Sequence, residues 1–176
     1  MSVEKYRAAV SLLKQRGLEP VSVRLPDEAT LRLLESRLGV RLPVSYRRML
    51  SEFGIFAVDA IDIAGVGNNG LDGDNVGNVV FGTERYRSEG WLADSMIRIA
   101  SSGYGPFFFI DCAEIGPDGE APVYEAPKGG FKLGKDKIAD SFGAFLLEEA
   151  EKVIEFIDED ESYDDQSEES DPNKAG

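Results

Sequence analysis

Acidic side chains come closer than any other residues of this chain to a catalytic arrangement. Asp111, Glu114, Asp118 and Glu125 gather around the end of one apolar stretch. Two carboxylates can hydrolyse a glycosidic bond when one is protonated and the other is ionised. The chain contains 33 acids, however, so this proximity is expected by chance. Nothing in the sequence marks out a pair with perturbed pKa values, and we therefore do not expect a hydrolase.

Histidine is absent from the sequence. Its absence removes the usual general base, the commonest metal ligand and the usual partner of a nucleophilic serine or cysteine. Cys112 is the single cysteine, and the negative charge of Asp111 beside it disfavours the reactive thiolate. Zinc requires four nitrogen or sulfur ligands with suitable spacing. We expect a buried or half-buried structural thiol, no zinc site and no enzymatic activity.

A glycine pattern typical of dinucleotide-binding proteins lies in residues 65–78. Gly65, Gly67 and Gly70 follow a predicted strand with the required spacing. That mechanism also needs a helix to begin at once, because the N–H groups of its first turn hold the pyrophosphate. The residues after Gly70 are instead rich in glycine, asparagine and aspartate, which favour turns. We interpret residues 65–78 as a loop and expect no cofactor.

The same loop contains part of a calcium-binding pattern. Asp72 and Asp74 would supply the ligands at positions 1 and 3 of a twelve-residue calcium loop. Val76 stands at position 5 and offers no side-chain oxygen, and Thr83 replaces the bidentate glutamate at position 12. The sequence leaves a weak cation site open and does not indicate a calcium-binding protein.

The net charge of −14 is the strongest global property of the chain. Residues 158–176 hold nine of the acids and a single lysine, although the remainder of the chain is acidic as well. Nucleic-acid binding depends on clustered lysine and arginine, so we expect no nucleic-acid partner. Opposite charges accelerate association, so the composition favours a basic protein partner.

The composition also indicates the cellular compartment. No run of eighteen apolar residues is present, so we expect no membrane span. Residues 1–17 have the pattern of an amphipathic helix and lack the layout of a signal peptide. A single cysteine is typical of a reducing compartment. We therefore expect a cytoplasmic protein.

Helices are predicted at both ends of the chain and strands between them. Three helices should end at Gly17, Gly39 and Gly54, and a long final helix should follow Asp140. The other predicted elements are strands over residues 56–63, 79–81, 96–100, 107–111 and 122–125, and a short helix over 84–89 capped by Thr83. The 107–111 and 122–125 strands should form an antiparallel hairpin, with the former central in the sheet. Residues 158–176 hold too little apolar surface to offset the entropy of ordering them, so we expect a domain over 1–157 and a disordered acidic tail.

Three segments together resemble the SUKH superfamily, which is named for the yeast cell-wall regulator Smi1/Knr4. The first runs from Leu34 through Leu38-Gly39-Val40 and Leu42-Pro43-x-x-Tyr46 to Gly54. The second begins at Trp91 and continues through Phe108-Phe109-Ile110-Asp111 to Pro122-Val123-Tyr124. The third is Ile138-Ala139-Asp140-Ser141-Phe142-x-x-Phe145-Leu146. They occur in the family's order between about Leu31 and Leu147.

The resemblance implies an α+β fold in a single domain, with helices packed around a curved, largely antiparallel sheet. Bacterial members of the superfamily are mostly immunity proteins, which bind and neutralise secreted toxins, often nucleases; others are regulators or scaffolds. No shared catalytic residues are implied. We expect a non-catalytic, bacterial immunity-type protein, with a regulatory or scaffolding domain as the alternative. The sequence does not indicate the identity of the toxin or the oligomeric state.

Partner contacts are predicted at aromatic residues in or near turns and at acids near loops and strand ends. Tyrosine and tryptophan are favoured interface anchors, although a tryptophan is as readily explained by burial in the core. The predicted contact residues are Asp72, Asp74, Tyr86, Trp91, Tyr104, Asp111 and Glu114. The acidic tail is a further predicted contact region, with solubility as its simpler explanation.

Overall fold

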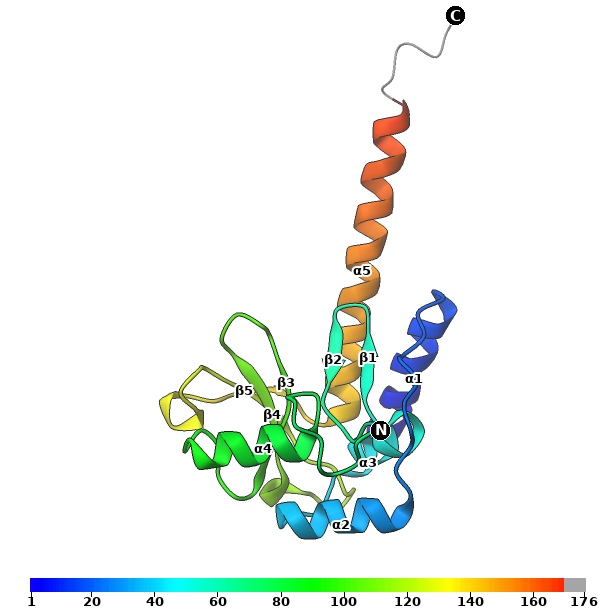
Figure 1. Ribbon diagram of the computed structural model, residues 1–176. Helices are drawn as coiled ribbons and strands as arrows, with labels where there is room; N and C mark the ends of the chain where they lie inside the picture. Colours follow the sequence, from blue (N-terminus) through cyan, green and yellow to red (C-terminus); the bar gives the residue numbers. More distant parts are fainter. Residues whose placement is uncertain (170–176) are drawn as a thin grey trace, which may run out of the picture.

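Five α-helices and six strands make up residues 1–169, the part of the chain that the computed structural model describes (Figure 1). The helices are α1 (Ser2–Gln15), α2 (Glu28–Leu38), α3 (Val44–Phe53), α4 (Val79–Ser88) and α5 (Phe142–Glu169). The strands are β1 (Phe56–Val58), β2 (Ile61–Ile63), β3 (Met96–Ser101), β4 (Phe107–Asp111), β5 (Val123–Ala126) and β6 (Asp136–Ala139). The predicted α+β class is confirmed.

The main sheet is antiparallel, with the strand order β3-β4-β5-β6, and β1 and β2 form a separate hairpin. β4 is an inner strand and pairs with β5 so that Phe109 lies opposite Tyr124, as the predicted hairpin requires. β6 was not predicted, because the pattern of Asp136–Ala139 is mostly polar and exposed. The sequence therefore identified the centre of the sheet and missed one edge.

The two faces of the main sheet contact different apolar clusters. Successive side chains of a strand point to opposite faces. Phe108 and Ile110 of β4 accordingly pack with the larger core, which includes residues of α1, α2, α3 and α5. Phe107 and Phe109 belong to a second, mainly aromatic cluster on the other face. This second cluster supports the aromatic surface described below.

The first three helices end and begin where the local signals indicate. Asp27 accepts a hydrogen bond from the Thr30 N–H at 2.8 Å and caps α2. Gly39 ends α2 with a φ of 66°, a left-handed conformation that glycine adopts without a steric penalty. Pro43 precedes α3, and Tyr46 from that helix is fully buried. The predicted architecture of residues 27–54 is confirmed.

The predicted strand at 79–81 is wrong, because these residues form the first turn of α4. The Asn78 side chain accepts hydrogen bonds from the N–H groups of Val80 and Phe81, at 2.9 and 3.1 Å. This cap outweighs the strand preference of the two valines. Thr83, the predicted cap, lies inside the helix, and its hydroxyl accepts a hydrogen bond from the Arg98 N–H.

The single strand predicted over 56–63 is a tight hairpin. β1 and β2 pair antiparallel, with Val58 opposite Ile61. Asp59 adopts a φ of 50° in the turn between them, which aspartate tolerates better than most residues. Ala60 lies in the same turn and is exposed.

The last helix, α5, extends past the domain boundary that the sequence predicts. α5 packs against α1 and then continues well beyond the body of the protein (Figure 1). It begins after Ser141, whose hydroxyl accepts a hydrogen bond from the Ala144 N–H at 3.2 Å. The domain boundary predicted at residue 157 falls inside the helix, which runs to Glu169. Residues 170–176 of the predicted tail lie outside the described part of the chain, and the division into domain and tail remains a prediction.

Candidate functional site

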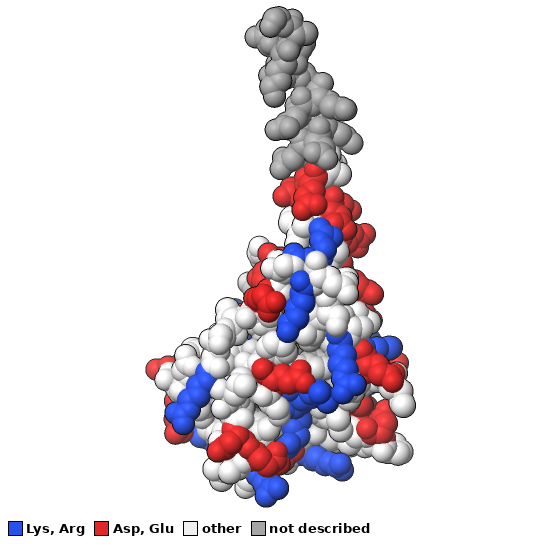
Figure 2. Space-filling model, turned by 90° about the vertical axis from the view of Figure 1, so that its right-hand side faces the viewer, with Lys and Arg blue, Asp and Glu red and all other residues white. Residues whose placement is uncertain are grey.

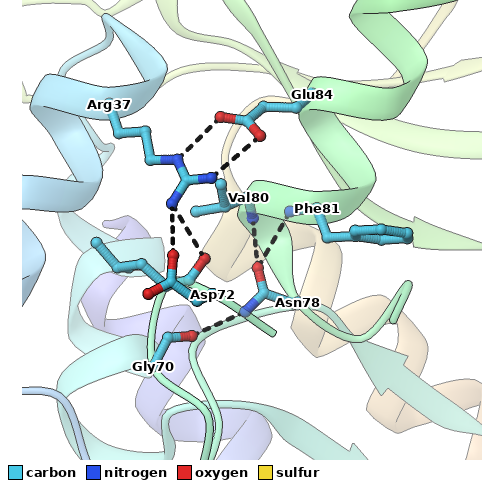
Figure 3. Close-up of polar contacts among 8 residues, drawn as sticks. Arg37, Gly70, Asp72, Asn78, Val80, Phe81 and Glu84 are labelled. Atoms are coloured by element: carbon cyan, nitrogen blue, oxygen red, sulfur yellow. Dashed lines mark hydrogen bonds and ion pairs between the residues drawn. The ribbon is translucent and has the colours of Figure 1, made fainter. Parts of the chain in front are cut away.

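The loop over residues 65–78 is held in place by two side chains (Figure 3). Arg37 of α2 donates to Glu84 of α4 at 2.9 Å and to Asp72 at the far side of the loop at 3.1 Å. Asn78 donates from its Nδ2 atom to the carbonyl of Gly70 at 2.8 Å while capping α4. The loop connects β2 to α4, and these contacts fix it to α2 and to the start of α4.

Asp72 forms an ion pair with Arg37. Its carboxylate is largely exposed, yet one oxygen faces the Arg37 guanidinium. Within the part of the chain that the structure describes, no three histidine, cysteine or acidic side chains are grouped so that they could hold a metal ion. Asp74 lies exposed in the same loop.

Replacing Asn78 by alanine should destabilise the fold by about 2 kcal/mol, because two helix N–H groups and the Gly70 carbonyl lose one shared partner. Urea unfolding followed by circular dichroism measures this change. Asp27→Ala is the matched control, since Asp27 caps α2 at an exposed position and should cost about 1 kcal/mol. Equal losses in the two variants would contradict the role assigned to Asn78.

Asp111 and Glu114 lie next to one another but differ in exposure. Asp111 is buried and accepts a hydrogen bond from the Ser95 hydroxyl at 2.9 Å. Glu114 is exposed and accepts a hydrogen bond from the Tyr124 hydroxyl at 2.9 Å. Lys135 lies 3.6 Å from Glu114 and 3.8 Å from Asp111. Asp111 therefore serves the internal structure, and only Glu114 presents a carboxylate at the surface.

The Cys112 thiol is half-buried, as the sequence predicts. Burial, followed by the negative charge of Asp111, raises the pKa of this thiol to about 12. Only the thiolate reacts with iodoacetamide. At pH 8 the folded chain should therefore be alkylated on the order of 1000-fold more slowly than the urea-unfolded chain, from the difference in thiolate fraction. Mass spectrometry of timed samples measures both rates, and similar rates would contradict the raised pKa.

Three predicted aromatic residues surround one hollow, which we call the aromatic groove. It is about 480 Å³ in volume. Its lining comprises Val76, Arg85, Tyr86, Glu89, Trp91, Ser101, Gly103, Tyr104, Gly105 and Lys128. The Tyr86 and Trp91 rings meet edge to face with centroids 5.0 Å apart, and Trp91 also stacks on Phe107. Tyr104 is 99% exposed. Trp91 is thus partly a core residue and partly a wall of the groove.

A second hollow lies along α5 beside α1, and we call it the acidic seam. Its volume is about 510 Å³. Leu12 and Ile154 supply its apolar surface. The other lining residues are Glu151, Glu155, Asp158, Glu159 and Ser162. Figure 2 shows acidic side chains gathered on the described part of the projecting helix, whereas acidic and basic residues are mixed over the visible face of the body.

The predicted contact residues thus lie in three separate places: the loop, the Glu114 region and the aromatic groove. The acidic seam carries the acids of α5 up to Glu159, and part of the predicted tail belongs to it. Sequence reasoning missed Arg98, which lies behind the aromatic groove, and Lys128 on its rim. An arginine between Ile97 and Ile99 in a buried strand was the available signal.

The fold defines an α+β domain built on a four-stranded antiparallel sheet, and its surface carries the aromatic groove and the acidic seam. Residues 28–146 match a SUKH family model described as SMI1-KNR4 cell-wall, and the chain belongs to this family. Members of the family are generally non-catalytic and are often immunity proteins. No curated protein matches the chain. Every helix in residues 1–169 is too short or too polar to traverse a bilayer.

Proposed function

We propose that this domain is a cytoplasmic, bacterial immunity protein that binds a secreted toxin and blocks it stoichiometrically. The family supports a protein-binding role, since its members are often immunity proteins. The single observation that carries the choice of partner is the acidic seam on α5. A toxin that acts on nucleic acid presents a basic surface, and such a surface is complementary to this seam.

The distribution of charge supports α5 as the contact element. Twelve of the 33 acids but only one of the 19 basic residues lie in α5. The preceding 141 residues have nearly balanced charges, with 20 acids and 17 basic residues. An electrostatic field concentrated on one projecting helix accelerates encounter with a cationic partner.

The acidic seam combines charge with an uncovered apolar strip. Leu12 and Ile154 line the hollow and are only partly buried. Apolar side chains bordered by charges are typical of an interface whose partner buries the apolar atoms and pairs the charges. Self-association through this surface would bring like charges together, so a basic segment is the better occupant.

Co-expression with the toxin encoded beside the gene tests the proposal. The protein should form a one-to-one complex and relieve the toxicity. The Glu155→Lys/Glu159→Lys variant should lower the affinity roughly 10- to 100-fold and reduce its dependence on salt. Glu19→Lys/Asp62→Lys makes the same change in net charge at exposed positions of the body and should have a much smaller effect.

Two outcomes would contradict the proposal. Equal effects of the two double variants would remove the acidic seam from the interface. Capture of cellular regulators, without any basic toxin, would favour a regulatory or scaffolding domain instead.

A further inference from the structure

Arg98 is a buried cation without an acidic partner. The residue is 4% exposed and lies in β3. Its Nη1 atom donates to the Val76 carbonyl at 2.8 Å, and its Nη2 atom donates to the Ser101 hydroxyl at 3.1 Å. The guanidinium carbon lies 5.2 Å from the centre of the Tyr86 ring. Among the side chains that the structure describes, no carboxylate lies within 4 Å of Arg98.

Burying this cation removes hydration that its contacts replace only in part. A buried charge requires pairing to offset its lost hydration, and all three neighbours of the guanidinium are uncharged. The Nε atom is also buried without a hydrogen-bond partner. Gly82 of α4 leaves space for the side chain, since a Cβ atom there would lie 3.1 Å from Nη1. Glycine is a poor helix former, and its presence at position 82 is explained by the space that the Arg98 side chain needs.

The guanidinium lies directly behind the wall of the aromatic groove. Val76, Tyr86 and Ser101, which contact Arg98, all line the groove as well. Arg85 and Lys128 lie on its rim. Glu89 is the single acid of the described lining, and it pairs with Arg85 at 3.2 Å. The local charge is therefore positive in a chain whose net charge is −14.

We propose that the aromatic groove binds an acidic peptide segment, with a carboxylate drawn toward Lys128 and the field of Arg98. Trp91 and Tyr104 would contact the apolar side chains beside that carboxylate. An open hollow of about 480 Å³ accommodates two or three side chains of an extended segment. The site is separate from the acidic seam, and it is independent of whether the partner is a toxin.

Trp91 provides the assay, because it is the only tryptophan of the chain and lies in the groove. The full chain is titrated with a capped hexapeptide of alternating glutamate and leucine while its tryptophan fluorescence is followed. A saturable change that weakens at high salt is expected. Capped hexapeptides with glutamine or lysine in place of glutamate should bind at least 10-fold more weakly. Equal binding of the glutamine peptide, or no saturable change, would overturn the proposal.

Charge variants test whether the basic residues of the groove bind the glutamate peptide. Lys128→Glu changes an exposed rim residue and should weaken the glutamate peptide at least 10-fold. Lys132→Glu makes the same charge change at an exposed position outside the groove lining and should alter the affinity less than 2-fold. Arg98→Met keeps the length of the side chain and should also lose the binding. If that variant does not fold, Lys128→Glu decides alone.

Two further results would overturn the proposal. Equal weakening by the two lysine variants would indicate a general charge effect. Tighter binding of a short oligothymidylate than of the glutamate peptide would assign the groove to nucleic acid. Loss of toxin binding in the variants of the acidic seam, with peptide binding intact, would separate this site from the proposed function.

Discussion

Gly65→Ala should destabilise the protein by about 4 kcal/mol or more, which is enough to unfold many domains of this size. A Cβ atom at Gly65 would overlap the carbonyl oxygen of Gly54 and lie 2.9 Å from its carbonyl carbon. Both are backbone atoms, so no side-chain rotation relieves the overlap. The same Gly54 carbonyl accepts the Val66 N–H at 2.8 Å, which fixes the two segments against each other.

Gly67→Ala is the matched control for this prediction. The nearest atom to a Cβ there is Cδ1 of Ile55 at 3.3 Å, the end of a side chain that can shift. We expect a change of no more than about 1 kcal/mol. Urea unfolding midpoints of the two variants give the comparison. Similar stabilities would show that the backbone at Gly54 can move to admit a Cβ atom. The close approach of residues 54 and 65 would then not be what requires glycine at position 65.

Glu120→Ala should cost about 3 kcal/mol, because it leaves two buried donors without an acceptor. The Glu120 carboxylate accepts the Ser45 N–H at 2.9 Å and the Ser45 hydroxyl at 2.8 Å, at the start of α3. Glu120 is 7% exposed and Ser45 is fully buried. Glu125→Ala, at a half-buried position of β5, is the control and should cost less than about 1 kcal/mol. Thermal and urea unfolding measure both variants. Equal losses of stability in the Glu120 and Glu125 variants would contradict the role of the Glu120–Ser45 pair.

The same carboxylate predicts a dependence of stability on pH. Burial raises the pKa of Glu120 above its ordinary value of 4.5, although the Ser45 hydrogen bonds act in the opposite direction. The folded state then holds this proton more tightly than the unfolded state. The contribution of Glu120 is therefore fully present below pH 4.5 and is lost as the pH rises through the folded pKa.

Glu120→Gln removes that titration and keeps one acceptor oxygen. The stability of the wild type relative to this variant should fall as the pH rises from 4 to 7. Urea midpoints of both proteins, measured across this range, give the difference in stability. The contributions of the other carboxylates are the same in both proteins and cancel. A relative stability that rises with pH over the same range would show that the hydrogen bonds from Ser45 outweigh burial.

Local signals predicted the helices of residues 27–54 because the residues that start and stop them act on their own backbone. Gly39 and Pro43 need no distant partner to have their effect. The start of α4 was missed for the opposite reason. Asn78 caps the helix while bonded to Gly70, and that pairing exists only when the loop between them is closed. Strand preference at Val79 and Val80 was the stronger local signal.

The candidate surfaces were predicted by residue type and only partly by position. Tyr86, Trp91 and Tyr104 meet around one hollow because α4 and the β3–β4 turn lie side by side, which no spacing in the sequence indicates. Asp111 was expected at the surface, but it is buried by the Ser95 contact. The charge of Arg98 was hidden within an apolar strand pattern. The assignment of these residues to partner contacts remains a prediction.

The packing of the first helix on the last has a consequence for how the protein is made. Tyr6 and Leu13 of α1 are fully buried in the core that Phe142 and Leu146 of α5 help to form. α1 contacts α3 as well, and the Tyr6 hydroxyl donates to Glu52 of that helix, but α5 is synthesised about 130 residues after α1 ends. The part of α1 that faces α5 therefore stays uncovered until α5 has left the ribosome. Complete burial of Tyr6 and Leu13 during translation has to wait for α5.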